Sequence, residues 1–134
     1  MFTTRSIRTL KKGSLVEITE EVQKIVAQSG IVHGVAVVRT PDTDAGILCT
    51  SFYDPKGHED ITDDFTRIFP ARDNFHRQES VTHCAAHSKA SVAGMSMDFI
   101  VEDGKLMLGG SQGIFLAEYC FPQLRAYSVA VMGV

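Results

Sequence analysis

Three of the five histidines lie within twelve residues, between His76 and His87. Neutral imidazole is a common ligand for divalent transition metals and titrates near neutral pH, so this cluster could bind a metal or exchange protons. His83 and His87 are four residues apart, so a helix would place them on one face. Cys84 stands where a zinc protease carries its general-base glutamate, which excludes an HExxH site. Two histidines do not complete a coordination shell, and on spacing alone histidines that hydrogen-bond to neighbours are the simpler interpretation.

The alanine-rich segment around these histidines favours a helix that ends at Gly94. Two more helices are expected to position it. The first has Thr19 as its N-cap and ends at Ser29-Gly30, with apolar residues on one face. The second spans residues 58–70 and has acidic residues early in its sequence, after a turn at residues 54–57.

Strands are predicted between these helices, from β-branched and apolar runs bounded by turn residues. Residues 31–40 are apolar at nearly every position, which is typical of a central strand buried on both faces. The other strands are expected at 2–10, 15–18, 46–52, 96–101, 105–108, 114–121 and 125–132. Helices interleaved with antiparallel hairpins indicate one α+β domain over residues 1–134, in which an antiparallel-rich sheet packs against helices.

The composition narrows the classes of function. The 134 residues suffice for one domain with its own core. A net charge of −3 without a Lys/Arg cluster argues against a nucleic-acid partner. No apolar run approaches the ~20 residues that span a bilayer, and the first residues lack a signal peptide's apolar region. Three widely separated cysteines without a CxxC pair indicate a reduced, cytoplasmic protein.

Four sequence motifs follow one another nearly without gaps. They are Thr43–Gly46 through Asp54-Pro55, His76 followed by His87-Ser-Lys89, Ser91 with Gly94, and Gly110-Ser-Gln-Gly-Ile-Phe-Leu-Ala-Glu118. In this order they resemble the YjbQ-like proteins, a family often labelled secondary thiamine-phosphate synthase, over essentially the whole chain. The resemblance implies a compact α+β fold, assembly as a homotrimer and a metal-containing cleft near the subunit contacts.

The resemblance also implies that three histidines define this cleft. The second and third match His76 and His87, whereas the first falls on Asp42. Aspartate is a legitimate oxygen ligand for a divalent metal, so these three residues form a chemically competent set, with zinc as the expected metal. His83 stands where the family usually has an aspartate or a small residue, and it could supply a replacement ligand. Alternatively, Asp42 serves only the turn after Pro41, and His83 is an exposed neighbour.

Two further residues are catalytic candidates. Glu118 lies in an otherwise apolar strand, and because a buried carboxylate is unfavourable unless it is paired, a polar cleft is its expected place. Lys89 could hold a phosphate as a point charge, although a solvated lysine is the alternative. The family's Asn-Glu pair corresponds here to Thr50-Ser51, so the resemblance implies that the cleft has lost a carboxylate.

Two functions are therefore open. The first is an enzyme with a metal- or histidine-dependent cleft that acts on a phosphorylated small molecule, with the weak thiamine-phosphate synthase-type activity that the resemblance implies; a metal would neutralise phosphate charge. The chain has no Asp-rich diphosphate motif and no P-loop. The second is a non-catalytic trimer whose degenerate cleft binds a metal or small anion. The changes at Asp42 and Thr50-Ser51 favour the second function, and the retained histidines, Lys89 and Glu118 favour the first.

Overall fold

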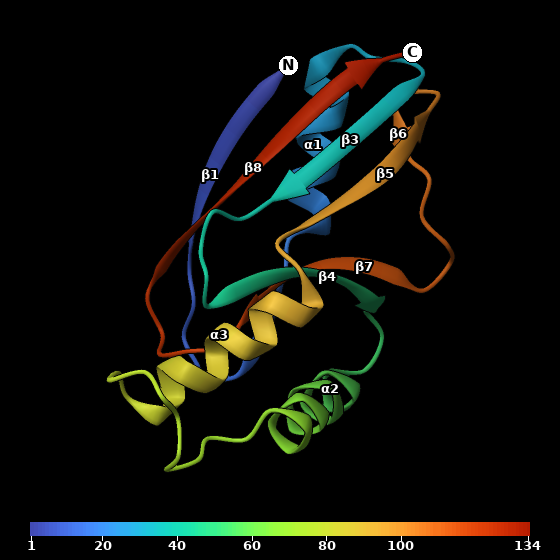
Figure 1. Ribbon diagram of the computed structural model, residues 1–134. Coiled ribbons are helices and arrows are strands. Elements are labelled where there is room, and N and C mark those ends of the chain that lie inside the picture. Colours follow the sequence, from blue (N-terminus) through green and yellow to red (C-terminus); the bar gives the residue numbers. More distant parts are fainter.

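Two antiparallel sheets form the scaffold of the protein (Figure 1). The computed structural model describes residues 1–134 and has a five-stranded sheet of order β1-β8-β3-β5-β6 and a three-stranded sheet of order β2-β7-β4. The strands are β1 (Phe2–Arg8), β2 (Ser14–Glu17), β3 (Gly34–Arg39), β4 (Ala45–Ser51), β5 (Ser96–Glu102), β6 (Lys105–Leu106), β7 (Gln112–Glu118) and β8 (Leu124–Gly133). Every strand pairing is antiparallel.

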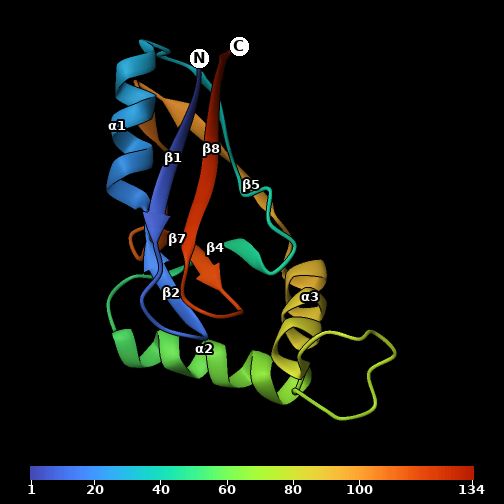
Figure 2. The ribbon, with the colours of Figure 1, turned by 90° about the vertical axis from the view of Figure 1, so that its left-hand side faces the viewer.

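Three helices cover different parts of these sheets. Helix α1 (Thr19–Ser29) lies along one face of the five-stranded sheet. Helices α2 (Pro55–Ile68) and α3 (Val81–Ala93) lie at the end of the molecule opposite the two chain termini (Figure 2). The predicted α+β class with an antiparallel sheet packed against helices is confirmed. None of the three helices is long and apolar enough to cross a membrane.

The main apolar core lies between α1 and the sheets. Val22, Ile25 and Val26 of α1 are fully buried, as their helical spacing predicts. They pack with inward side chains of both sheets, among them Phe99 and Val129. Burial of each such aliphatic side chain stabilises the fold by about 1.5–3 kcal/mol.

Strand β3 is buried on one face only, which corrects the prediction for residues 31–40. Its side chains alternate between fully and partly buried along Gly34–Arg39, because α1 covers one side of the sheet and the other side has no helix. Gly34 is required at the start of the strand, since an added Cβ would lie 1.9 Å from the carbonyl oxygen of Met132 on β8. The strand therefore passes too close to its neighbour for any side chain there.

The predicted starts of helices α1 and α2 are wrong, and in both helices the N-cap residue explains the difference. Ile18 occupies the N-cap position of α1 without a side-chain bond, because the Thr19 hydroxyl accepts a bond from the Ile114 backbone N–H on β7 at 2.8 Å. Residues 54–57 begin α2 instead of forming a separate turn. Asp54 caps that helix by accepting from the Lys56 N–H at 2.9 Å, and Pro55 suits the first helical position.

Candidate functional site

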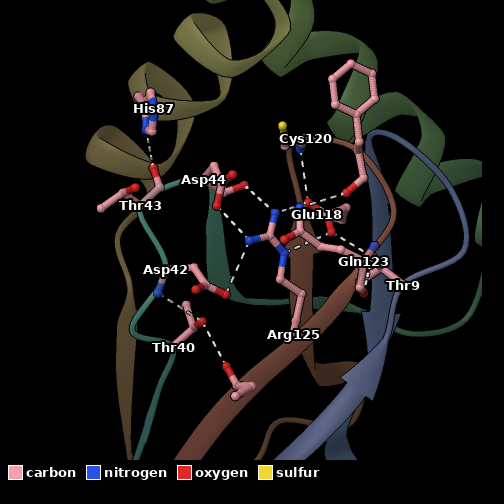
Figure 3. A network of polar contacts seen from close by, with 12 residues as sticks. Thr9, Thr40, Asp42, Thr43, Asp44, His87, Glu118, Cys120, Gln123 and Arg125 are labelled. Carbon is pink, nitrogen blue, oxygen red and sulfur yellow. Dashed lines mark hydrogen bonds and ion pairs between the residues drawn. The ribbon is translucent and has the colours of Figure 1, made fainter. Parts of the chain in front are cut away.

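A buried ion-pair network centres on Arg125 of β8 (Figure 3). Its side chain is 2% exposed, and it donates to Glu118 through Nε at 2.9 Å and Nη2 at 2.5 Å. Nη1 donates to Asp44 at 2.6 Å and lies 3.3 Å from an oxygen of Asp42. Burial alone would lower the pKa of Arg125, but its hydrogen bonds to Glu118 and Asp44 outweigh that effect and raise it. The guanidinium thus joins the end of β7 to the loop before β4.

Glu118 has no exposed surface in the single chain and lies in a buried polar network. Besides Arg125, its carboxylate accepts from the Thr9 hydroxyl at 2.6 Å and from the Cys120 backbone N–H at 3.1 Å. The expectation that a carboxylate in this apolar strand needs partners is met by these bonds. Within this chain Glu118 positions Arg125 and cannot reach a molecule in solvent.

His87 lies between two oxygen acceptors. Its Nδ1 is 3.0 Å from the backbone carbonyl oxygen of Thr43, and its Nε2 is 3.0 Å from Oε2 of Glu79. Because a carbonyl can only accept, Nδ1 carries a proton, and Nε2 points toward the Glu79 carboxylate. A backbone carbonyl that holds one ring nitrogen is also the usual support of a metal-binding histidine. Glu79 in turn pairs with Arg77 at 3.1 Å.

His76 and His87 line the same hollow, which has a volume of about 470 Å³. Arg72 and Arg77 also line it, so two arginines and two histidines border one hollow. Asp42 lines a neighbouring hollow and is held by Arg125 instead. Of the three predicted metal ligands, the structure brings two to one hollow.

His83 and Lys89 of α3 do not line the hollow of His76 and His87. His83 lies beside Asp44 and Cys120, on the helix face that also carries His87, since both approach the segment Thr43-Asp44. Lys89 reaches toward α2, where Nζ lies 3.4 Å from the Thr66 hydroxyl. Burial, with a smaller contribution from the charge of Lys12, lowers the pKa of Lys89. Lys89 therefore does not face the hollow that His76 and His87 line.

Two of the predicted metal ligands lie at one hollow, but His76, His87 and Glu79 do not form a three-ligand cluster with atoms within 4.8 Å of one another. His76 and His87 provide imidazoles at one hollow, and Glu79 provides a carboxylate oxygen directly opposite Nε2 of His87. Imidazole nitrogen with carboxylate oxygen is a normal zinc environment. Asp42 fits less well within one chain, because it lines a neighbouring hollow and not the one that His76 and His87 line.

The candidate site residues predicted from the sequence did not include Arg125, Asp44, Glu79 or the two arginines of the hollow. One signal for Arg125 exists in the sequence. It shares its side of β8 with Tyr127, Val129 and Val131, so a charged residue interrupts an alternating apolar pattern. Its partner Asp44 is 81 residues away in sequence, and no local pattern indicates that pairing.

The family model described as UPF0047 protein YjbQ-like matches residues 3–134. The UPF0047 protein YugU of Bacillus subtilis is 35% identical over 99% of this chain and 100% of its own length. A UPF0047 protein of Methanocaldococcus jannaschii is 36% identical over 95% of this chain and 91% of its own.

Solved structures agree with these sequence matches. A YjbQ/UPF0047 protein from Clostridium acetobutylicum has a TM-score of 0.91 at 36% identity, covering 97% of this chain and 99% of that chain. A YbjQ-like protein from Sulfolobus solfataricus has a TM-score of 0.93 at 28% identity, covering 100% of this chain and 97% of that chain. The sequence motifs, the two-sheet architecture and these matches lead to one conclusion: the chain belongs to the YjbQ-like UPF0047 family.

Proposed function

We propose that this protein binds a small phosphorylated molecule together with a divalent metal ion in the hollow lined by His76 and His87, and that it does not convert the bound molecule. The observation that carries this proposal is that two histidines and two arginines line one hollow. Such a set of donors matches the oxygens and negative charge of a phosphate group.

The arginines of the hollow keep donors free for an anion. Arg72 stacks over the ring of Phe75 at 4.1 Å and uses Nη1 for Asn74, and Arg77 uses Nη2 for Glu79. Each guanidinium has five N–H groups, so several remain for a ligand. Stacking on an aromatic ring also fixes the plane of Arg72, which reduces the entropy lost on binding.

His76, His87 and Glu79 would hold the metal, with zinc as the expected ion. Bound there, the ion would neutralise charge on the phosphate oxygens. Thr43 supports the site by holding Nδ1 of His87, so the ring presents Nε2 to Glu79 and the ion. Protonated imidazole cannot ligate, so metal uptake should weaken as pH falls through the histidine range.

The second candidate function is an enzyme of thiamine-phosphate synthase type, which the family resemblance suggests. One observation favours it: Nε2 of His87 lies 3.0 Å from the Glu79 carboxylate, and paired imidazole and carboxylate groups are common in acid–base catalysis. Against it, Glu118 is fully buried and Lys89 faces Thr66, so neither of the predicted catalytic residues reaches the hollow. We therefore place binding first and turnover second.

We further propose that the protein assembles as a homotrimer through the outer face of the five-stranded sheet. No helix covers this face (Figure 2). Its cross-strand rows bring apolar side chains together: Val35 lies between Ile100 and Met132, and Val37 and Phe2 both pair with Ala130. Ile100, Met132 and Phe2 are exposed in the single chain. Contiguous exposed apolar side chains on a sheet are typical of a protein contact.

The test of the binding function is calorimetry on protein without a histidine tag. Micromolar zinc should bind to the wild type, and inorganic phosphate should bind more tightly to the zinc-loaded protein than to the metal-free protein. His87→Ala should remove the zinc bound in the hollow and the effect of zinc on phosphate binding, whereas His33→Ala, which changes an exposed histidine outside the hollow, should change neither. Equal uptake of phosphate by the wild type and His87→Ala would contradict the proposal, and formation of product from a phosphorylated substrate would favour the enzyme.

A further inference from the structure

A second cluster of metal-ligating side chains lies outside the hollow. One ligand atom each from Asp44, His83 and Cys120 can be chosen so that all three lie within 4.8 Å of one another. They come from three separate parts of the chain: the loop before β4, helix α3 and the residues after β7. From this convergence we infer that Asp44, His83 and Cys120 form a binding site for a zinc-type divalent ion, separate from the hollow of His76 and His87.

Each of the three residues keeps an atom free for a metal. Arg125 occupies Oδ1 of Asp44, and Oδ2 takes part in no hydrogen bond. The Cys120 sulfur is buried and is not in a disulfide. Nδ1 of His83 lies 2.6 Å from the Ser80 hydroxyl, so Nε2 is the free ring nitrogen.

Ser80 supports the tautomer of His83 that a metal requires. Its hydroxyl oxygen accepts from the His83 backbone N–H at 3.2 Å and caps α3. With two lone pairs, the same oxygen can also accept from Nδ1–H, which leaves the lone pair of the ring on Nε2. The ring is held further by an edge contact with Phe121, at 5.5 Å between centroids. A ligand oriented in this way loses little freedom when it binds an ion.

The local charge favours a cation. Asp42, Asp44 and Glu118 surround a single guanidinium, that of Arg125, which gives this group a net charge of −2. Lys12 is the other nearby cation, and its Nζ is 5.5 Å from the centroid of the Phe121 ring. Counting Lys12, the surroundings remain negative. A divalent ion would therefore reduce the repulsion among these carboxylates.

The chemistry of the three ligands indicates the class of metal. Thiolate, imidazole and carboxylate together suit zinc or cobalt rather than magnesium or calcium, which prefer oxygen alone. On binding, the Cys120 thiol loses its proton to solvent and the thiolate sulfur bonds to the ion. Asp44 and His83 are partly exposed, whereas Cys120 is buried, so the ion would enter past the aspartate and histidine. A water molecule can complete the fourth position.

The test uses cobalt as a spectroscopic probe on tag-free, reduced wild-type protein. Coordination by a thiolate should give a sulfur-to-cobalt charge-transfer band in the near ultraviolet, which zinc should abolish by displacement. Cys120→Ser should lose this band. The matched controls Cys49→Ser and Cys84→Ser should retain it, because neither sulfur belongs to the cluster.

Further variants separate this site from the hollow. His83→Asn should weaken cobalt binding by about tenfold or more. A circular dichroism spectrum like that of the wild type would show that the variant is folded and that the loss of affinity comes from the missing ligand. His87→Ala should keep the band even though it removes the metal site proposed in the hollow. Absence of a band in the wild type, its persistence in Cys120→Ser, or unchanged affinity in folded His83→Asn would each overturn the inference.

Discussion

The two ends of the molecule are held together by different forces. At the α1 end, a helix packs on the sheets through fully buried aliphatic side chains such as Val22 and Ile25. At the α3 end, the apolar cluster is small and is made largely of alanines with Tyr119 and Cys120. All four buried residues with polar or charged side chains lie outside α1 and α3, in the strands and adjoining segments: Thr9, Thr40, Glu118 and Arg125.

This difference indicates where ligand binding belongs. Apolar burial is non-directional and leaves no group free for chemistry. The network around Arg125 instead fixes the segment Asp42–Asp44, and Thr43 in that segment holds His87. The ion pairs are therefore positioning elements for α3 and the loop opposite it. Both proposed metal sites lie at this end of the protein.

The largest expected effect comes from breaking the ion pair at the α3 end. Glu118→Ala would leave the Arg125 guanidinium buried with only Asp44 and Asp42 as charged partners, so we expect a loss of about 3–5 kcal/mol in the free energy of unfolding. Urea denaturation followed by circular dichroism measures this loss.

A double variant provides the control for this effect. Glu118→Leu combined with Arg125→Met removes both fully buried charges, and it should be less destabilising than Glu118→Ala, because the carboxylates that lose Arg125, Asp44 and Asp42, are partly exposed. If Glu118→Ala lowered stability by less than about 1 kcal/mol, the network could not be what holds this end together.

A smaller effect is expected at the α1 end. Ile25→Val removes one buried methylene from α1, which should lower the free energy of unfolding by about 0.5–1.5 kcal/mol. The two ends should also differ in a second measurement: Ile25→Val should leave zinc and cobalt binding unchanged, whereas Glu118→Ala should weaken both. Equal effects of the two variants on metal affinity would remove the distinction between the ends.

The α1 end could be predicted from the sequence, because its stability depends on local periodicity. Val22, Ile25 and Val26 identify the helix and its buried face. Its start could not be predicted, because the Thr19 hydroxyl bonds to Ile114, 95 residues away, instead of capping its own helix. Tertiary contacts thus override a local preference.

At the α3 end the sequence predicted the residues better than their partners. It placed His83 and His87 on one helix face, and it indicated that Glu118 needs a partner. The partner of Glu118 on β7 is Arg125 on β8, a strand of the other sheet, and Asp44, the second partner of that arginine, is 81 residues away from it in sequence. The ligand set of Asp42, His76 and His87 stays a prediction that the metal-binding experiments test.

The smallest expected effect concerns Lys89, between α3 and α2. Burial and the charge of Lys12 lower its pKa below the ordinary value of 10.5, so the folded protein releases this proton at a lower pH than the unfolded chain does. In that pH interval the unfolded chain binds more protons, and stability should therefore rise with pH. Below that pH interval, the charged lysine destabilises the fold.

Lys89→Met should thus be slightly more stable than the wild type at neutral pH, and the difference should shrink as pH approaches 10.5. Urea denaturation across this range measures the difference, with exposed Lys56→Met on α2 as the control. A Lys89→Met protein that is less stable at neutral pH would show instead that the contact between Lys89 and Thr66 stabilises the α2–α3 junction.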